Sequence, residues 1–184
     1  HPALKAVSPH APVTDCYMGD DVHHNGAFML AEMVSFQPWF EYSMNNKNVR
    51  NGVRNFNFPD LMVSDIYSDY LRIGTYSNIT AAYADSLHYL QTVREHPDLD
   101  EYWISHTVSK GHLHDVKPAV MVVGGLFDKE DCYGAFDVYK TIESESPATD
   151  LYLIEGPWFH GAWDRSMRPL WANMYFGDEA TSEY

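Results

Sequence analysis

The sequence predicts an α/β fold with a parallel sheet, and three segments carry this prediction. Two short apolar stretches, 119–123 and 151–154, each lead through turn-forming glycine to a reactive polar side chain. Between them, large apolar residues recur every three positions from Tyr133 to Ile142, as in a helix that packs on a sheet. Strands that alternate with helices in this way indicate a parallel sheet.

The order of the remaining elements agrees with this fold. Strand patterns alternate with helical patterns, and polar loops separate them. From the N-terminus, the expected segments are a strand at 3–7, a polar loop to residue 26, a rough helix at 27–38, a clear helix at 79–93 before Pro97, a strand at 119–123, a helix at 133–142, a strand at 151–154 and a further segment at 168–175. Strand patterns at both ends therefore enclose a helical middle.

The middle of the chain predicts a helical insertion. Residues 25–112 are too long for a simple crossover between parallel strands, so we expect a core segment at 1–24, a helical cap at 25–112 and a second core segment at 113–184. The chain starts with His1 and reaches a strand almost at once. We therefore interpret it as an internal piece of a longer protein.

The charge of the chain argues against nucleic acid as a partner. The formal net charge is −14, from 26 acidic and 12 basic residues. Affinity for nucleic acid comes from Lys and Arg that displace counterions, so we expect no such partner. No stretch approaches the roughly 18 apolar residues that a membrane-spanning helix requires, so we expect no membrane span.

The cysteine and histidine patterns predict neither a metal site nor a cofactor. Cys16 and Cys132 lack the CxxC spacing of zinc or redox sites, and we expect free thiols. Histidines occur as a pair at 23–24 and as His112-x-His114, but adjacent histidines usually diverge and zinc needs three or four ligands.

An acid and a base follow the two apolar stretches. Asp128 comes after Gly124-Gly125-Leu126-Phe127, and His160 comes after Gly156-Pro157-Trp158-Phe159. Parallel sheets present reactive groups at the carboxyl edge, and a histidine base needs a carboxylate to orient its ring. Acid before base is the chain order of α/β-hydrolases, in which a serine precedes both. We therefore predict that Asp128 and His160 converge above this edge.

The sequence leaves a structural alternative open. Asp128 would then only cap the helix that starts near Asp131, and His160 would only occupy a turn. A G-x-S-x-G nucleophile elbow would decide between the two interpretations, but the chain contains none. Neither Ser8 nor Ser77 has flanking glycines, so neither is assigned as the nucleophile.

Further carboxylates stand beside the predicted acid. Glu130 and Asp131 follow Asp128 closely, and Asp20 and Asp21 end another polar loop. Converging anions raise one another's pKa, and a bound cation would relieve this cost. The alternative is a set of solvated acidic loops in a protein that is rich in acid.

Four stretches together resemble the CocE/NonD hydrolases, and more narrowly the α-amino acid ester hydrolases of that group. The relatives include cocaine esterase, glutaryl acylases and X-Pro dipeptidyl peptidases. The stretches are His1-Pro2-Ala3-Leu4-Lys5-Ala6-Val7-Ser8-Pro9, Gly19-Asp20-Asp21-x-His23-His24-Asn25-Gly26-Ala27-Phe28, Gly124-Gly125-Leu126-Phe127-Asp128-x-Glu130-Asp131 and Gly156-Pro157-Trp158-Phe159-His160-Gly161. The resemblance spans nearly the whole chain and is weakest through the cap.

The resemblance implies a partial α/β-hydrolase core with a largely helical cap, followed in the family by a jelly-roll domain. It implies that Asp128 and His160 are the acid and base of a triad whose serine lies in a G-x-S-Y-x-G elbow shortly before His1. It further implies that Asp21, Glu130 and Asp131 receive the α-ammonium group of the substrate. The expected function is a serine hydrolase or acyltransferase for α-amino acid esters or amides, inactive as this chain alone.

Two other functions stay open, as do location and assembly. One is a general esterase or acylase, similar to cocaine esterase or glutaryl acylase, in which the acidic trio is structural. The other is a non-catalytic α/β remnant.

Leu126 stands where relatives commonly have tryptophan, and Cys16 stands where they vary, which leaves the pocket shape undefined. The resemblance suggests a periplasmic or secreted protein and homo-oligomers.

Overall fold

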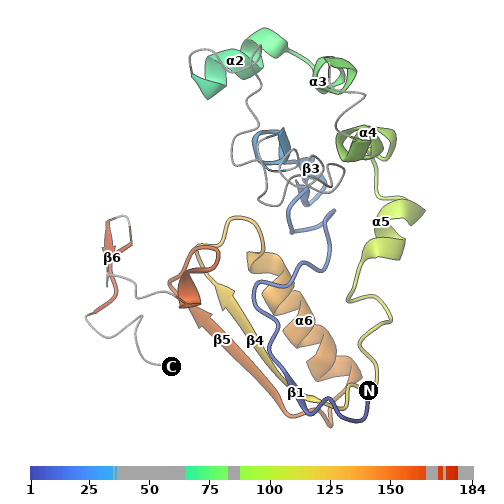
Figure 1. The fold of residues 1–184 in the computed structure, drawn as a ribbon, viewed down its shortest axis with the longest axis vertical. Coiled ribbons are helices and arrows are strands. Elements are labelled where there is room, and N and C mark those ends of the chain that lie inside the picture. Colours follow the sequence, from blue (N-terminus) through green and yellow to red (C-terminus); the bar gives the residue numbers. More distant parts are fainter. Residues whose placement is uncertain (35, 37–64, 83–87, 165–169, 172, 178–184) are drawn as a thin grey trace, which may run out of the picture. The chain divides into compact units, whose positions relative to one another are not determined.

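A three-stranded parallel sheet forms the core of the computed structural model (Figure 1). Its strands are β1 (Ala6–Val7), β4 (Ala119–Gly125) and β5 (Leu151–Gly156), in the order β1-β4-β5. The α/β fold predicted from the sequence is confirmed. The structure describes residues 1–34, 36, 65–82, 88–164, 170–171 and 173–177.

The strand register brings the carboxyl ends of β4 and β5 level with each other. Pairing runs from Val120↔Leu151 to Gly125↔Gly156. On the other side of β4, Ala6 pairs with Ala119, and an isolated bridge joins His10 to Val123. The first strand is shorter than the predicted 3–7, because residues 1–4 form a turn in which the Leu4 amide donates to the His1 carbonyl at 2.9 Å.

Helix α6 (Cys132–Glu145) covers one face of this sheet (Figure 1). Valines of β4 meet Ala135, Val138 and Ile142 of the helix, and Leu151 and Leu153 of β5 pack against the same cluster. Each fully buried valine contributes about 1.5–3 kcal/mol to stability. Because strand side chains alternate between faces, the next β5 side chain on this helix-covered face is that of Glu155.

A second apolar cluster lies on the opposite face. It centres on Val123, Trp158 and Ala162, with Met121 and Ile154 packed against it. Trp158 and Ala162 belong to the segment after β5, which continues into the 3-10 helix η1 (Ala162–Asp164). The loop that carries His160 is therefore anchored on both sides by buried residues.

The chain divides into two compact units, residues 1–27 with 101–184 and residues 28–100. The second unit contains a helical stretch at 30–34 and the helices α2 (Ile66–Ile73), α3 (Tyr76–Ala82) and α4 (His88–Glu95). Helix α5 (Glu101–His106) belongs to the first unit. The predicted helix at 79–93 is helical on both sides of 83–87, which lie outside the described residues. A cap at 25–112 stays a prediction.

The helix predicted at 27–38 begins differently. Residues 27 and 28 form strand β3 (Ala27–Phe28), which pairs with β2 (His23–His24). The two residues between them, Asn25 and Gly26, have φ values of 51° and 78°. Two positive φ values at Asn-Gly are the signature of a tight hairpin turn, so the start of the predicted helix is wrong for this reason. Residues 35, 37 and 38 of that helix lie outside the described residues.

The last described segment does not extend the parallel sheet. Strands β6 (Leu170–Trp171) and β7 (Met174–Tyr175) form a separate antiparallel pair. The segment expected at 168–175 is therefore a short hairpin wherever it is described. Within the part of the chain that the structure describes, no helix has the length and apolarity to cross a bilayer.

Candidate active site

The loops after β4 and β5 run side by side beyond the ends of the two strands. The Leu126 amide donates to the Gly156 carbonyl at 2.9 Å, and the Phe127 amide donates to the Trp158 carbonyl at 3.0 Å. These bonds hold the two loops together just before each presents its reactive side chain. The sheet edge thus delivers Asp128 and His160 to one place, as the parallel topology predicts.

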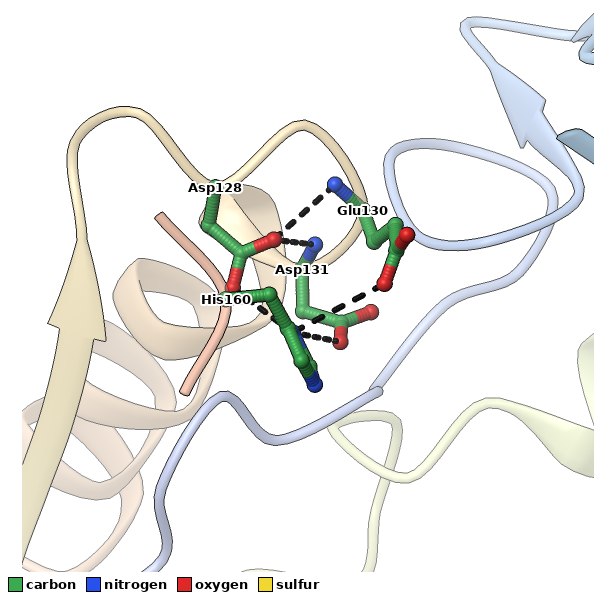
Figure 2. A group of neighbouring side chains, drawn as sticks. All are labelled: Asp128, Glu130, Asp131 and His160. Carbon is green, nitrogen blue, oxygen red and sulfur yellow. Dashed lines mark hydrogen bonds and ion pairs between the residues drawn. The ribbon is translucent and has the colours of Figure 1, made fainter. Parts of the chain in front are cut away.

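Asp128 and His160 form a hydrogen-bonded pair (Figure 2). Asp128 Oδ2 lies 2.9 Å from His160 Nδ1. The Asp128 side chain is 0% exposed, whereas the His160 side chain is 49% exposed. A buried carboxylate that holds an accessible imidazole through Nδ1 leaves the ring's second nitrogen available to a substrate or nucleophile.

The second oxygen of Asp128 organises its own loop. Asp128 Oδ1 accepts hydrogen bonds from the backbone amides of Glu130 at 3.0 Å and Asp131 at 3.1 Å. The structural alternative, in which Asp128 caps the turn before α6, is therefore correct for Oδ1. The other oxygen bonds to His160, so the two interpretations are compatible.

Two further carboxylates lie close to the same imidazole, and a third residue, Asp21, is bonded to their loop through its backbone. Asp131 Oδ2 lies 3.3 Å and Glu130 Oε2 lies 3.8 Å from His160 Nδ1 (Figure 2). The Asp21 amide donates to the Glu130 carbonyl at 3.3 Å, which fastens the loop of Asp21 to this group. Asp21 has a φ of 37°, in the left-handed region that aspartate tolerates better than most residues.

The negative charges at this site repel one another. Burial raises the pKa of Asp131 to about 8, and the charges of Asp21, Asp128, Asp20 and Glu130 add to this effect. Asp131 Oδ1 is buried and accepts no hydrogen bond from any described residue. A cation placed among these oxygens would favour the ionised form of Asp131.

One oxygen each from Asp128, Glu130 and Asp131 and a ring nitrogen of His160 lie within 4.8 Å of one another. This spacing suits a small cation, either a metal ion or an ammonium group. Recruiting His160 Nδ1 as a metal ligand would break its bond to Asp128. An ammonium group needs only the carboxylate oxygens, so it leaves that pair intact.

Comparison with known proteins places the chain in a family. Residues 1–162 match the family model for X-Pro dipeptidyl-peptidases of the S15 family. The chain belongs to the S15 family. The resemblance read from the sequence motifs is thus confirmed at the level of the family.

A solved structure has a similar fold. The chain is 31% identical to an aminopeptidase from the marine sediment archaeon Thaumarchaeota archaeon, with a TM-score of 0.79. The match covers 98% of this chain and 28% of the archaeal chain, so this chain spans less than a third of that relative's length. No curated protein matches the chain closely enough to be counted.

Two other histidines and the two cysteines of the S15 chain make different contacts. His23 is buried in β2, where burial lowers its pKa, and its Nδ1 lies 3.3 Å from the Cys16 carbonyl. His114 lies near the far end of α6, 3.2 Å from Glu145. Both cysteines are free and partly buried. None of these residues joins the described cluster around His160.

The roles of two residues of this region were not predicted from the sequence. Asp20 is fully buried, and its carboxylate accepts from the Thr14, Asp15 and Gly134 amides, which ties the loop of Asp21 to α6. Only the tandem Asp20-Asp21 hinted at this, and it does not distinguish the two neighbours. Glu155 is the second, and its signal was a charged residue at an inward position of β5.

Proposed function

We propose that the protein containing this chain is a serine hydrolase that transfers acyl groups from α-amino acid esters or amides through an acyl-enzyme. One observation carries the proposal: His160 Nδ1 bonds to buried Asp128 at 2.9 Å while two more carboxylates lie within 4 Å of it. The S15 family membership supports a hydrolase, and the acidic surroundings support a substrate with a positive charge.

The reaction uses His160 as a base and then as an acid. His160 Nε2 takes the proton of the nucleophilic serine, whose oxygen attacks the acyl carbonyl and forms a tetrahedral intermediate. The imidazolium then gives this proton to the departing alcohol or amine, and the acyl group stays on the serine. Water or an acceptor amine releases the acyl group by the same sequence of proton transfers. Asp128 orients the ring and stabilises the imidazolium throughout.

In this proposal Asp21, Glu130 and Asp131 hold the α-ammonium group. An α-ammonium is separated from the scissile carbonyl by a single carbon, so a site beside His160 places both groups correctly at once. The binding energy of the ammonium then positions the carbonyl for attack. It also offsets the burial and the repulsion that together raise the pKa of Asp131.

Amide hydrolysis at a free amino terminus is the second candidate. The archaeal relative is an aminopeptidase, and a peptide with a free terminus carries the same α-ammonium beside its first carbonyl. Both candidates therefore use the same carboxylates. They differ in the leaving group, which is a small alcohol or amine in the first and the rest of a peptide in the second. Rates on an α-amino ester and on a peptide with the same first residue distinguish them.

The test is Asp21→Asn in the intact protein, assayed with an α-amino ester and its des-amino analogue. Loss of one charge contact should raise KM for the α-amino ester about tenfold, roughly 1.4 kcal/mol, and leave the des-amino ester unchanged. Asp150→Asn, at an exposed site before β5, is the matched control and should change neither. Equal effects on both esters would refute the ammonium site and favour a general esterase. No hydrolysis by the wild type would favour a non-catalytic remnant.

A further inference from the structure

Glu155 carries a carboxyl group in a position where the strand pattern calls for an apolar side chain. In β5 it follows Leu151 and Leu153 on the face that α6 covers. Both of its carboxyl oxygens are buried and accept no hydrogen bond from any residue that the structure describes. Burying an unpartnered carboxyl costs stability, so its presence calls for an explanation.

The sheet makes room for this carboxyl with a glycine. Gly124 pairs with Glu155 across β4 and β5. A Cβ atom on Gly124 would lie 2.3 Å from Glu155 Oε1 and 2.8 Å from the Cβ of Ala135 in α6. Any larger residue at 124 would collide with both. The Glu155 carboxyl is therefore held between the end of β4 and the first turns of α6.

The titratable neighbours of Glu155 come from the elements on either side. From the loop after β4 comes Asp128, and from the first turn of α6 comes Cys132. Burial raises the pKa of Glu155 to about 7, and the charge of Asp128 adds to the effect. In turn, burial and then the charge of Glu155 raise the pKa of the Cys132 thiol. Glu155 therefore exchanges its proton near the pH at which an ordinary histidine does.

We propose that Glu155 is a positioning residue for the catalytic pair: it acts on His160 through Asp128 by holding a proton behind that carboxylate or releasing it. This inference rests on the proposed function, because it assigns Glu155 to the same acid and base. A protonated Glu155 adds no charge to the carboxylates of Asp128, Glu130 and Asp131 that lie near the imidazole. An ionised Glu155 adds one more negative charge, which favours the imidazolium.

The coupling has a signature that packing alone would not produce. As the pH rises, Glu155 loses its proton, and its negative charge then makes the loss of the His160 proton less favourable. The two protons therefore leave over a wider pH range than a single ionisation would require. A neutral residue at 155 removes the contribution of Glu155, while that of Asp131, 3.3 Å from His160 Nδ1, remains. His160 should therefore lose its proton at lower pH and over a narrower range than in the wild type.

The test follows His160 by NMR in the intact protein with isotope-labelled histidine, because this readout does not require turnover. The variants are Glu155→Gln and Glu155→Met, which remove the charge with and without a polar group. Both should lower the midpoint of the His160 titration by roughly half to one pH unit and narrow it. Glu155→Asp keeps the charge and should retain the wide titration. Glu143→Gln removes an exposed acid from α6 and should leave the curve unchanged.

The outcomes separate this inference from the proposed function. A His160 curve that is the same in wild type, Glu155→Gln and Glu155→Met would overturn the role of Glu155, whatever the hydrolytic rate. A shift in only one neutral variant would also overturn it, because repacking and not charge would be the cause. If both neutral variants shift the curve while the wild type hydrolyses no ester, the coupling stands and the proposed function fails.

Discussion

Asp20 and Glu155 are both buried carboxyl groups near the start of α6, but the protein holds them in opposite ways. Asp20 accepts hydrogen bonds from the Thr14, Asp15 and Gly134 amides at 2.8–2.9 Å, and from the Thr14 hydroxyl at 3.2 Å. The two oxygens of Glu155 accept none from the described residues. Burial raises the pKa of both, but hydrogen bonds oppose this only at Asp20.

The same contrast recurs between Asp128 and Asp131, three residues apart. Asp128 uses both oxygens, one for two backbone amides and one for His160. Asp131 leaves Oδ1 buried without a donor among the described residues. A carboxyl with donors fixes the geometry of its loop, whereas one without donors stays ready for a proton or a cation. The site thus combines carboxyl groups that fix the loop geometry with carboxyl groups that can take up a proton or a cation.

The largest effect is expected from removing a carboxyl that builds the site. Asp20→Ala would leave three buried amides without an acceptor, at a combined cost of about 4 kcal/mol. Hydrogen exchange of the Thr14, Asp15 and Gly134 amides should quicken at least a hundredfold, which corresponds to about 2.7 kcal/mol or more. Asp150→Ala, which removes an exposed acid, is the control. Equal exchange in the two variants would show that Asp20 does not hold this loop.

A smaller effect of opposite sign is expected at Asp131. Its pKa is about 8 in the folded protein against an ordinary value of 3.8, so the folded state binds more protons between these values. The stability of the wild type therefore falls as the pH rises from about 4 to 8, and the full cost is present above pH 8.

Asp131→Asn removes this titration. The variant should be more stable than the wild type at pH 8.5, on the order of 2 kcal/mol, and the gain should shrink toward pH 5. Urea denaturation at several pH values measures the difference. A difference that does not change with pH would mean that Asp131 ionises normally in the folded protein. Asp128→Asn offers the contrast, because it removes an acceptor that already has donors and should destabilise at both pH values.

The convergence of Asp128 and His160 was predictable because it depends on topology. Two parallel strands that end in glycine must present the next residues at one edge, whatever the loops do in detail. The pairing of Gly125 with Gly156 supplies the level register that this inference requires. The family followed from long motifs around the same residues.

The behaviour of Glu155 was not predictable, because it depends on a space that only the packed structure reveals. Strand alternation puts Glu155 on the same face of β5 as Leu151 and Leu153, but only the packed structure shows that Gly124 leaves room there for a carboxyl group. The hairpin at Asn25-Gly26 was missed for another reason. Its turn signal was present, but the helical pattern of the residues after it dominated the interpretation.

The smallest effect is expected in the alkylation rates of the two cysteines, which report on the charges near Asp21 and near Glu155. Burial and then the charge of Asp21 raise the pKa of Cys16 to about 12. The pKa of Cys132 is raised less, by burial and then by Glu155. Iodoacetamide reacts with the thiolate, so at pH 8 Cys132 should be alkylated roughly tenfold faster than Cys16. Peptide mass spectrometry resolves the two rates.

Glu155→Gln turns this difference into a local probe of charge. Without the carboxylate beside it, Cys132 should react roughly threefold faster with iodoacetamide at pH 8. Glu155 is not among the causes of the raised pKa of Cys16, so Cys16 should keep its rate. Glu143→Gln should change neither rate. If Cys132 reacts at the wild-type rate in Glu155→Gln, Glu155 is uncharged at that pH and belongs with the structural carboxyls. If both thiols quicken together, the substitution has loosened α6 and the effect is not one of charge.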